Sequence, residues 1–219
     1  MKILGYTMLA VFFLSAAIHL FASLKQDKAL RNRTKPFILL GLLGFYCCAA
    51  EPIIWFTVLA LVFSWLGDIL LIPKGVKWFT AGGIAFMVSH VFFILSYLWQ
   101  IDFAVVTPWL AALLIVFFVA ASLILFRFLR PHLPKQLFYP MLMYLILNGM
   151  MNCFAWFRSM TIGGAAGVIT AVGALLFFLS DSSLFFVRFH KNSPLKTHFL
   201  VMLTYSLGEF LIILGLIMK

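Results

Sequence analysis

Long apolar runs follow one another along the whole chain, and short clusters of basic residues separate them. An α-helix rises 1.5 Å per residue, so about 20 apolar residues cross the roughly 30 Å hydrocarbon core of a bilayer. The runs predict an all-α membrane protein, a bundle of eight transmembrane helices that forms a single polytopic domain over residues 1–219. The expected spans are 3–24, 37–50, 53–72, 78–99, 104–126, 137–157, 162–187 and 196–218.

The second and third spans depend on how one long apolar run is divided. Residues 37–71 form a single run of 35 residues, about 52 Å as a helix, which is too long for one crossing. Glu51 and Pro52 interrupt it, because proline ends helices and a glutamate prefers the membrane interface. We therefore expect two helices here, of which the first is short or tilted.

The composition excludes a soluble domain and argues against nucleic-acid binding. Apolar residues make up 65% of the chain and charged residues 10%, whereas a soluble domain carries about 25% charged residues. The net charge of +10 could suggest a nucleic-acid partner, but the basic residues lie in short clusters between apolar runs. That placement is typical of topology determinants. The cysteines Cys47, Cys48 and Cys153 lie in apolar runs without metal-ligand spacing, so we expect them to pack as small apolar residues.

The distribution of basic residues predicts the orientation of the chain. If both termini lie on the non-cytoplasmic side, 13 of the 16 Lys and Arg residues fall in cytoplasmic loops, as the positive-inside rule requires. A single miscounted helix would move every later loop to the other side. The cytoplasmic set is Lys25, Lys28, Arg31, Arg33, Lys35, Lys74, Lys77, Arg127, Arg130, Lys135, Arg188, Lys191 and Lys196. The remaining three are Lys2, Arg158 and Lys219.

Three carboxyl groups fall inside expected spans, at Asp68, Asp181 and Glu209. A charged side chain at the bilayer centre costs about 2.5–3.5 kcal/mol even on the lenient insertion scale, so such residues usually mark function. Apart from Lys196 at the very start of the last one, no Lys or Arg lies within the expected spans, although Lys35 could reach Asp68 from a loop. Asp68, Asp181 and His19 lie at one level near the cytoplasmic boundary, whereas Glu209 and His90 lie deeper.

Helical periodicity places polar or small side chains in stripes on six of the expected helices. Small residues share the face of Asp181, which indicates that this aspartate faces neighbouring helices and not lipid. The stripes predict a polar internal cavity that opens towards the cytoplasmic side, although isolated polar residues such as Ser64 and Asn152 more often join helices by hydrogen bonds. The stripes contain Ser15 and His19; Thr57, Ser64 and Asp68; Gly83, His90 and Tyr97; Tyr144, Asn148 and Asn152; Gly163, Gly167, Ala171, Ala174 and Asp181; and His198, Tyr205 and Glu209.

Several of these stretches resemble the lysoplasmalogenase (YhhN-like) family of membrane proteins. The resemblance runs from about residue 30 to the C-terminus. This chain differs from the family pattern in the last span, where the resemblance leads us to expect a glutamine near the position of Glu209. The stretches are TKP (34–36), SWLGDILL (64–71), FTAGGIAF (79–86) followed by Ser89 and His90, YPMLMY (139–144) and GALLFFLSDS (173–182).

The resemblance implies a membrane hydrolase without a cofactor or metal, which cleaves the vinyl ether bond of lysoplasmalogens to a fatty aldehyde and a glycerophospho-base. It implies that Asp68 and Asp181 are catalytic. Vinyl ethers hydrolyse by acid, so the reaction needs a protonated carboxyl group and a carboxylate that stabilises an oxocarbenium ion, as in glycosidases. Our hypothesis makes Asp181 the acid and Asp68 the stabiliser. Expected substrate contacts are Lys35 at the lipid phosphate, with His19, His90, Tyr144, Asn148, Tyr205 and Glu209.

Other functions remain open at this stage. A proton-coupled transporter would also place acidic and histidine residues in the membrane. An intramembrane aspartyl protease would use two aspartates, but its usual motifs are missing; a metal-dependent lipid hydrolase could use His19 and His90, but no helix carries a ligand-spaced pair. We expect a lysophospholipid substrate, contact with membrane lipid and a bacterial inner membrane location, and leave homo-oligomerisation open.

Overall fold

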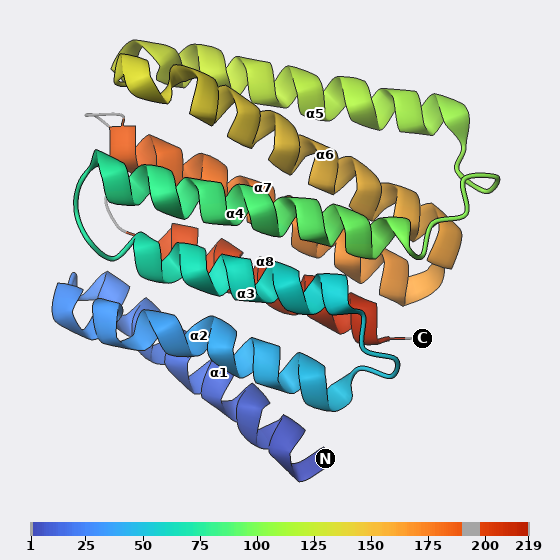
Figure 1. Ribbon diagram of the computed structural model, residues 1–219, viewed down its shortest axis with the longest axis horizontal. Helices are drawn as coiled ribbons and strands as arrows, with labels where there is room; N and C mark the ends of the chain where they lie inside the picture. The colour runs from blue at the N-terminus through green and yellow to red at the C-terminus, as the bar shows by residue number, and fades with distance from the viewer. Residues whose placement is uncertain (1, 190–197, 219) are drawn as a thin grey trace.

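The computed structural model describes residues 2–189 and 198–218. Within these ranges the chain forms eight α-helices, two 3-10 turns and no strand (Figure 1). The helices are α1 Lys2–Leu24, α2 Lys28–Ala49, α3 Trp55–Leu70, α4 Val76–Leu98, α5 Pro108–Leu129, α6 Phe138–Ile162, α7 Gly164–Phe189 and α8 Phe199–Ile217, and the turns are Arg130–His132 and Lys135–Leu137.

Six helices of the described chain are long and apolar enough to cross a membrane, namely α1, α4, α5, α6, α7 and α8. The helix α3 is apolar but has 16 residues, which corresponds to roughly 24 Å. The helix α2 is long enough, but basic residues occupy its first two turns. The chain is therefore a multi-pass membrane protein with an all-helical fold.

Seven of the described helices close a ring in the order α1, α2, α3, α4, α6, α7 and α8, and α5 packs outside it against α6 (Figure 1). The helices α7 and α8 pack closely where two glycines face each other. A Cβ at Gly173 would lie 2.6 Å from the backbone nitrogen of Ile212, and one at Gly208 would lie 2.9 Å from the carbonyl oxygen of Gly173. Both positions therefore require glycine, as small residues do at many membrane helix contacts.

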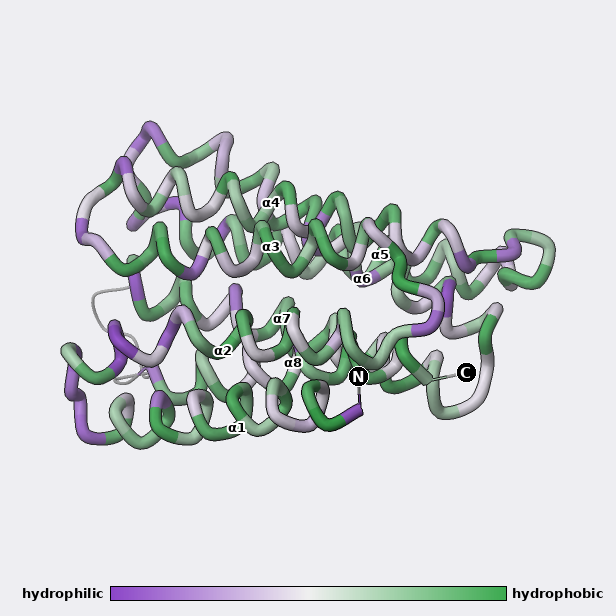
Figure 2. The backbone as a smooth tube through the Cα atoms, turned by 60° about the horizontal axis from the view of Figure 1, so that its bottom comes forward, coloured by the Kyte–Doolittle hydropathy of each residue, from purple (hydrophilic) through white to green (hydrophobic). Residues whose placement is uncertain are grey.

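The connections α1–α2, α3–α4 and α5–α6 and the last turn of α7 lie at the same end of the bundle, which we call the basic end (Figures 1 and 2). The basic clusters of the sequence lie there. Both termini lie towards the opposite end (Figure 1). Of the basic residues used to predict orientation, Lys191, Lys196 and Lys219 lie outside the described residues, as do the first two residues of the span expected at 196–218.

The expected spans agree approximately with the helices except at the start of α2, which begins at Lys28 and not near residue 37, and at the end of α6, which ends at Ile162 and not near residue 157. The side chain of Asp27 caps it by accepting a hydrogen bond of 3.0 Å from the backbone N–H of Leu30. The helix then continues through Pro36, whose carbonyl oxygen accepts a hydrogen bond of 2.9 Å from Nε1 of Trp65 on α3. The expectation that this helix starts after the proline, near residue 37, was wrong, because the N-cap at Asp27 begins it earlier.

A buried arginine joins the helices at the end away from the basic end. Arg158 is 1% exposed and lies inside α6, not in the loop where we expected it. Its guanidinium donates to Thr170 Oγ1 on α7 at 2.8 Å, to the carbonyl oxygen of Gly215 on α8 at 3.0 Å and to Gln100 Oε1 after α4 at 2.9 Å. No carboxylate within the described ranges pairs with it, so neutral acceptors compensate for its burial.

Candidate functional site

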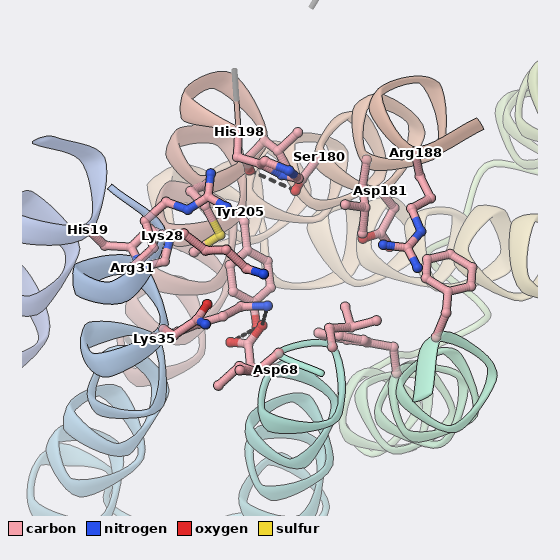
Figure 3. Close-up of a pocket in the computed structure, with 18 of the residues that line it drawn as sticks. His19, Lys28, Arg31, Lys35, Asp68, Ser180, Asp181, Arg188, His198 and Tyr205 are labelled. Atoms are coloured by element: carbon pink, nitrogen blue, oxygen red, sulfur yellow. Dashed lines mark hydrogen bonds and ion pairs between the residues drawn. The ribbon is translucent and has the colours of Figure 1, made fainter. Parts of the chain in front are cut away.

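A polar cavity of about 330 Å³ opens at the basic end, between α2, α3, α7 and α8 (Figure 3). Both candidate aspartates line it, Asp68 on one side and Asp181 on the other. The predicted internal cavity is thus present at the expected end of the bundle. Its polar lining is His19, Lys28, Arg31, Asn32, Lys35, Asp68, Lys74, Ser180, Asp181, Arg188, His198 and Tyr205.

The early start of α2 explains the basic side of this cavity. Lys28, Arg31 and Lys35 are three and four residues apart, so a continuous helix places them on one face. All three line the cavity. If residues 28–35 had formed a loop, as the sequence led us to expect, this alignment would not exist.

Asp68 is held as half of an ion pair. Its side chain is 3% exposed, its Oδ1 lies 3.1 Å from Nζ of Lys35, and its Oδ2 accepts a hydrogen bond of 2.9 Å from the hydroxyl of Tyr205 (Figure 3). The preceding residue, Gly67, allows the ring of Phe86 on α4 to pack against α3, since a Cβ there would lie 2.7 Å from that ring. An ammonium group and a phenol at this distance both favour the carboxylate form.

Asp181 has neutral partners. Its Oδ2 accepts hydrogen bonds from the hydroxyl of Tyr144 at 2.6 Å and from Nδ2 of Asn148 at 2.8 Å. Nε2 of His90 lies 3.8 Å from the same oxygen, beyond hydrogen-bond distance. No hydrogen bond to Oδ1 connects it with any residue in the described ranges. A proton on Oδ1 would leave both observed hydrogen bonds intact.

Two histidines flank the basic side of the cavity. His19 on α1 is 3% exposed, and its Nδ1 lies 3.0 Å from Thr34 Oγ1, which itself donates to the carbonyl oxygen of Leu30. His19 therefore donates to Thr34 and holds α1 against the turn that carries Lys35. His198 lies just before α8, where burial and then the charges of Arg31, Lys35 and Arg188 lower its pKa to about 4. It is neutral at pH 7, although cations surround it.

The remaining predicted site residues lie near the cavity but do not all line it. His90 and Asn148 contact Asp181 from α4 and α6 without lining the cavity, and Tyr144 lines a neighbouring groove. Glu209 on α8 is fully buried, and neither carboxyl oxygen makes a hydrogen bond within the described part of the chain. Glu209 therefore belongs to the interior of the bundle and not to this cavity.

Our sequence reasoning missed several residues of the cavity. Arg31 and Arg188 were treated as topology determinants, although each is a helical residue that faces the site. His198 and Ser180 also line it, and Ser180 donates to the carbonyl oxygen of Val201 at 2.9 Å. The spacing of Lys28, Arg31 and Lys35 was the available signal, and it would have been informative had α2 been extended to Asp27.

The profile of the YhhN family matches residues 30–216, which is most of the chain. The chain belongs to the YhhN family. The match includes both aspartates and every partner described above, namely Lys35, His90, Tyr144, Asn148 and Tyr205. We found no match among curated proteins or among solved structures. Within the described residues, no group of three or more His, Cys, Asp or Glu side chains is arranged to hold a metal ion.

Proposed function

We propose that this YhhN-family chain is a membrane-embedded hydrolase that cleaves the vinyl ether bond of lysoplasmalogens. Its products would be a fatty aldehyde and a glycerophospho-base. One observation carries the proposal: two buried carboxyl groups line one cavity, one paired with an ammonium group and the other bound by neutral donors. Membership of the YhhN family and the sequence resemblance to lysoplasmalogenases agree with it.

The partners of the two aspartates suggest their roles. Lys35 favours the ionised form of Asp68, as suits a group that stabilises a developing cation. Asp181 lines the cavity and has no ammonium or guanidinium partner among the described residues, and none of them makes a hydrogen bond to its Oδ1. A buried carboxyl group in such surroundings retains a proton more readily than one beside a cation. We therefore assign Asp181 as the acid and Asp68 as the stabilising carboxylate.

The reaction then follows acid hydrolysis of a vinyl ether. Asp181 transfers a proton to the outer alkene carbon, and the other vinyl carbon becomes part of an oxocarbenium ion facing Asp68. Water attacks that carbon and gives up a proton to Asp68, which forms a hemiacetal. The bond between this carbon and the glycerol oxygen then breaks, the glycerol oxygen takes up the hemiacetal proton, and the aldehyde is released. Exchange with water returns the proton from Asp68 to Asp181.

The substrate phosphate is best assigned to cations other than Lys35, because that side chain already pairs with Asp68. Arg31, Lys28 and Arg188 line the same cavity, and Lys28 and Arg188 are exposed at its rim. Arginine is well suited to bind phosphate through two parallel hydrogen bonds. We expect the headgroup to lie at this rim and the vinyl ether to lie deeper, between the aspartates.

We further propose that all eight helices cross the membrane and that the basic end faces the cytoplasm. The six apolar helices and the gathering of basic residues at one end support this orientation. It can be tested by labelling single cysteines at exposed positions in a variant without native cysteines. A membrane-impermeant reagent applied from the cytoplasmic side should label Lys74→Cys and leave Glu51→Cys unlabelled. The reverse result would overturn the orientation.

The test of function is direct. Purified protein in detergent is given lysoplasmenylethanolamine, and aldehyde release is followed for wild type, Asp68→Asn and Asp181→Asn. Glu51→Gln is the matched control, because Glu51 is exposed at the opposite end. We expect activity in wild type and control and almost none in either aspartate variant. No aldehyde from folded wild-type protein would overturn the proposal.

Glu209 favours one other function, a proton-coupled transporter. This carboxyl group is fully buried on α8, and the hydrolysis scheme above does not use it. Intramembrane carboxyl groups commonly take part in proton relays. A transporter would show proton-linked uptake in vesicles that Glu209→Gln abolishes, without any aldehyde product.

A further inference from the structure

A second groove, of about 400 Å³, lies beside the polar cavity on the outer surface of the bundle. It runs between the first turns of α4 and the first turns of α6, with two residues of α7 behind it. Its lining is almost entirely apolar: Leu71, Phe79, Thr80, Gly83, Ile84, Phe86, Met87, Leu137, Tyr139, Pro140, Met141, Met143, Tyr144, Leu184 and Phe185. A volume of this size is within the usual range of ligand pockets.

The groove and the polar cavity are adjacent parts of one site. Leu71, Phe79, Phe86 and Leu184 line both, so these side chains form the wall between them. Tyr144 provides a second link, because it lines the groove while its hydroxyl donates to Asp181 Oδ2 at 2.6 Å. A molecule in the groove therefore lies next to the residues that hold the proposed acid.

The outer side of the groove faces the lipid. Ile84 on α4 is 50% exposed and Met143 on α6 is 63% exposed, and both helices are long and apolar enough to cross a membrane. At Gly83 a Cβ would meet no heavy atom within 4 Å, so this position of α4 borders open space. Such an opening admits an apolar chain from the membrane without passage through water.

The wall between groove and cavity also carries a cation. The guanidinium of Arg188 lies 5.1 Å from the ring centroid of Phe79, which packs edge-on against Phe185 and Phe189. Arg188 lines the polar cavity, whereas Phe79 lines both spaces. An anionic headgroup near Arg188 would thus lie directly beside the start of the apolar groove.

We propose that the groove between α4 and α6 binds the single hydrocarbon chain of a lysophospholipid, which enters sideways from the membrane while its phosphate binds the basic rim. Rim and groove complement the two ends of such a molecule, and its ether linkage would lie between them, next to Tyr144 and Asp181. This inference rests on the proposed function for the chemistry at the linkage. It adds that the residues of the groove select the length of the chain.

The first experiment changes the space in the groove. Gly83→Trp should fill it, whereas Ala112→Trp places the same side chain on the exposed surface of α5 and serves as the matched control. Activity is compared on lysoplasmenylethanolamines with a hexadecenyl chain and with a hexenyl chain. Each buried methylene contributes strongly to binding, so Gly83→Trp should reduce the long-to-short ratio of kcat/KM by at least about tenfold. An unchanged ratio in a folded variant would overturn the proposal.

The second experiment does not depend on hydrolysis. An alkyl ether lysophospholipid, which has no vinyl group, carries a photoreactive diazirine at the end of its chain and is crosslinked to wild-type protein. We expect adducts within residues 80–87 and 137–144, which unlabelled lysophospholipid removes by competition. Adducts mainly on α5, or adducts that resist competition, would overturn the proposal. If wild type releases no aldehyde but these adducts form, the proposed reaction fails and the lipid site stands.

Discussion

Asp68 and Asp181 are the same residue type, lie at the same end of the bundle and border the same cavity, yet their surroundings differ. Asp68 has an ammonium group 3.1 Å away, whereas Asp181 accepts hydrogen bonds from a phenol and an amide. In a medium of low dielectric constant, a single cationic partner decides whether a carboxyl group is charged. Two aspartates can therefore have opposite roles without any difference in their own chemistry.

The largest expected effect comes from removing Asp181, the proposed acid. Asp181→Asn keeps the size of the side chain and its contacts with Tyr144 and Asn148, but it has no proton to transfer to carbon. We expect aldehyde release to fall by about 10²–10⁴-fold at every pH between 5 and 9, measured as kcat. Activity that recovers at low pH would contradict the assignment, because solution acid would then be sufficient.

The next largest effect should come from the cation. Lys35→Met leaves Asp68 buried without its partner, so a proton neutralises it more easily. We expect activity to fall about 10- to 100-fold and the acid limb of the pH–rate profile to move to higher pH.

A stability measurement supplies the control. The double variant Asp68→Asn with Lys35→Met should unfold at a higher temperature than Asp68→Asn alone, because Asp68→Asn alone leaves the ammonium group of Lys35 unpaired. A lower unfolding temperature for the double variant would show that the pair does not stabilise as described.

The two tyrosines offer a smaller, matched test. Tyr144→Phe removes one of two neutral donors from Asp181, whereas Tyr205→Phe removes a donor from an Asp68 that Lys35 still holds. A net hydrogen bond contributes about 0.5–1.5 kcal/mol, so we expect losses of kcat of up to about tenfold. The loss should be larger for Tyr144→Phe. Equal losses would indicate that Lys35 does not dominate the surroundings of Asp68.

The smallest effect concerns the positive field around the cavity. The pKa of His198 is about 4 in the folded protein and about 6.5 in an unfolded chain, so the unfolded state binds more protons between these values. Its contribution to stability is therefore complete above pH 6.5 and is lost as the pH falls towards 4. In a plot of unfolding temperature against pH, His198→Gln should therefore reduce the slope between pH 4 and 6.5. An unchanged slope would mean that burial and the charges of Arg31, Lys35 and Arg188 do not lower the pKa of His198 as described.

Much of the fold could be predicted from sequence, because hydrophobic length and the placement of basic residues are local signals. Apart from the start of α2 and the end of α6, the described helices begin and end near the expected boundaries. The helix α2 could not be placed correctly from Pro36 alone, since its start depends on the cap at Asp27 and its continuity on Trp65 of α3. Arg158 was missed as a buried residue for a similar reason: its acceptors come from three other segments.

Helical periodicity also found both aspartates and most of their partners, because each lies on a polar or small stripe of its own helix. Periodicity within one helix could not predict which side chain on another helix contacts which aspartate. The bond between Tyr205 and Asp68 joins residues 137 positions apart, and its formation depends on how α8 packs in the ring. Lys35 was named as a candidate cation for Asp68 and also for phosphate, and the structure favours the first.

The buried guanidinium of Arg158 limits how this protein can move. Its hydrogen bonds connect α6, α7 and α8 with the segment after α4 at the end far from the aspartates. Helices fixed at one end can separate only by splaying at the other, with an amplitude that grows along their length. If these hydrogen bonds keep the helices together at this end, the seam between α4 and α6 would widen at the other end, where the groove lies. Arg158 would then influence how far the bundle opens, and so how fast lipid enters and aldehyde leaves, without contacting either molecule.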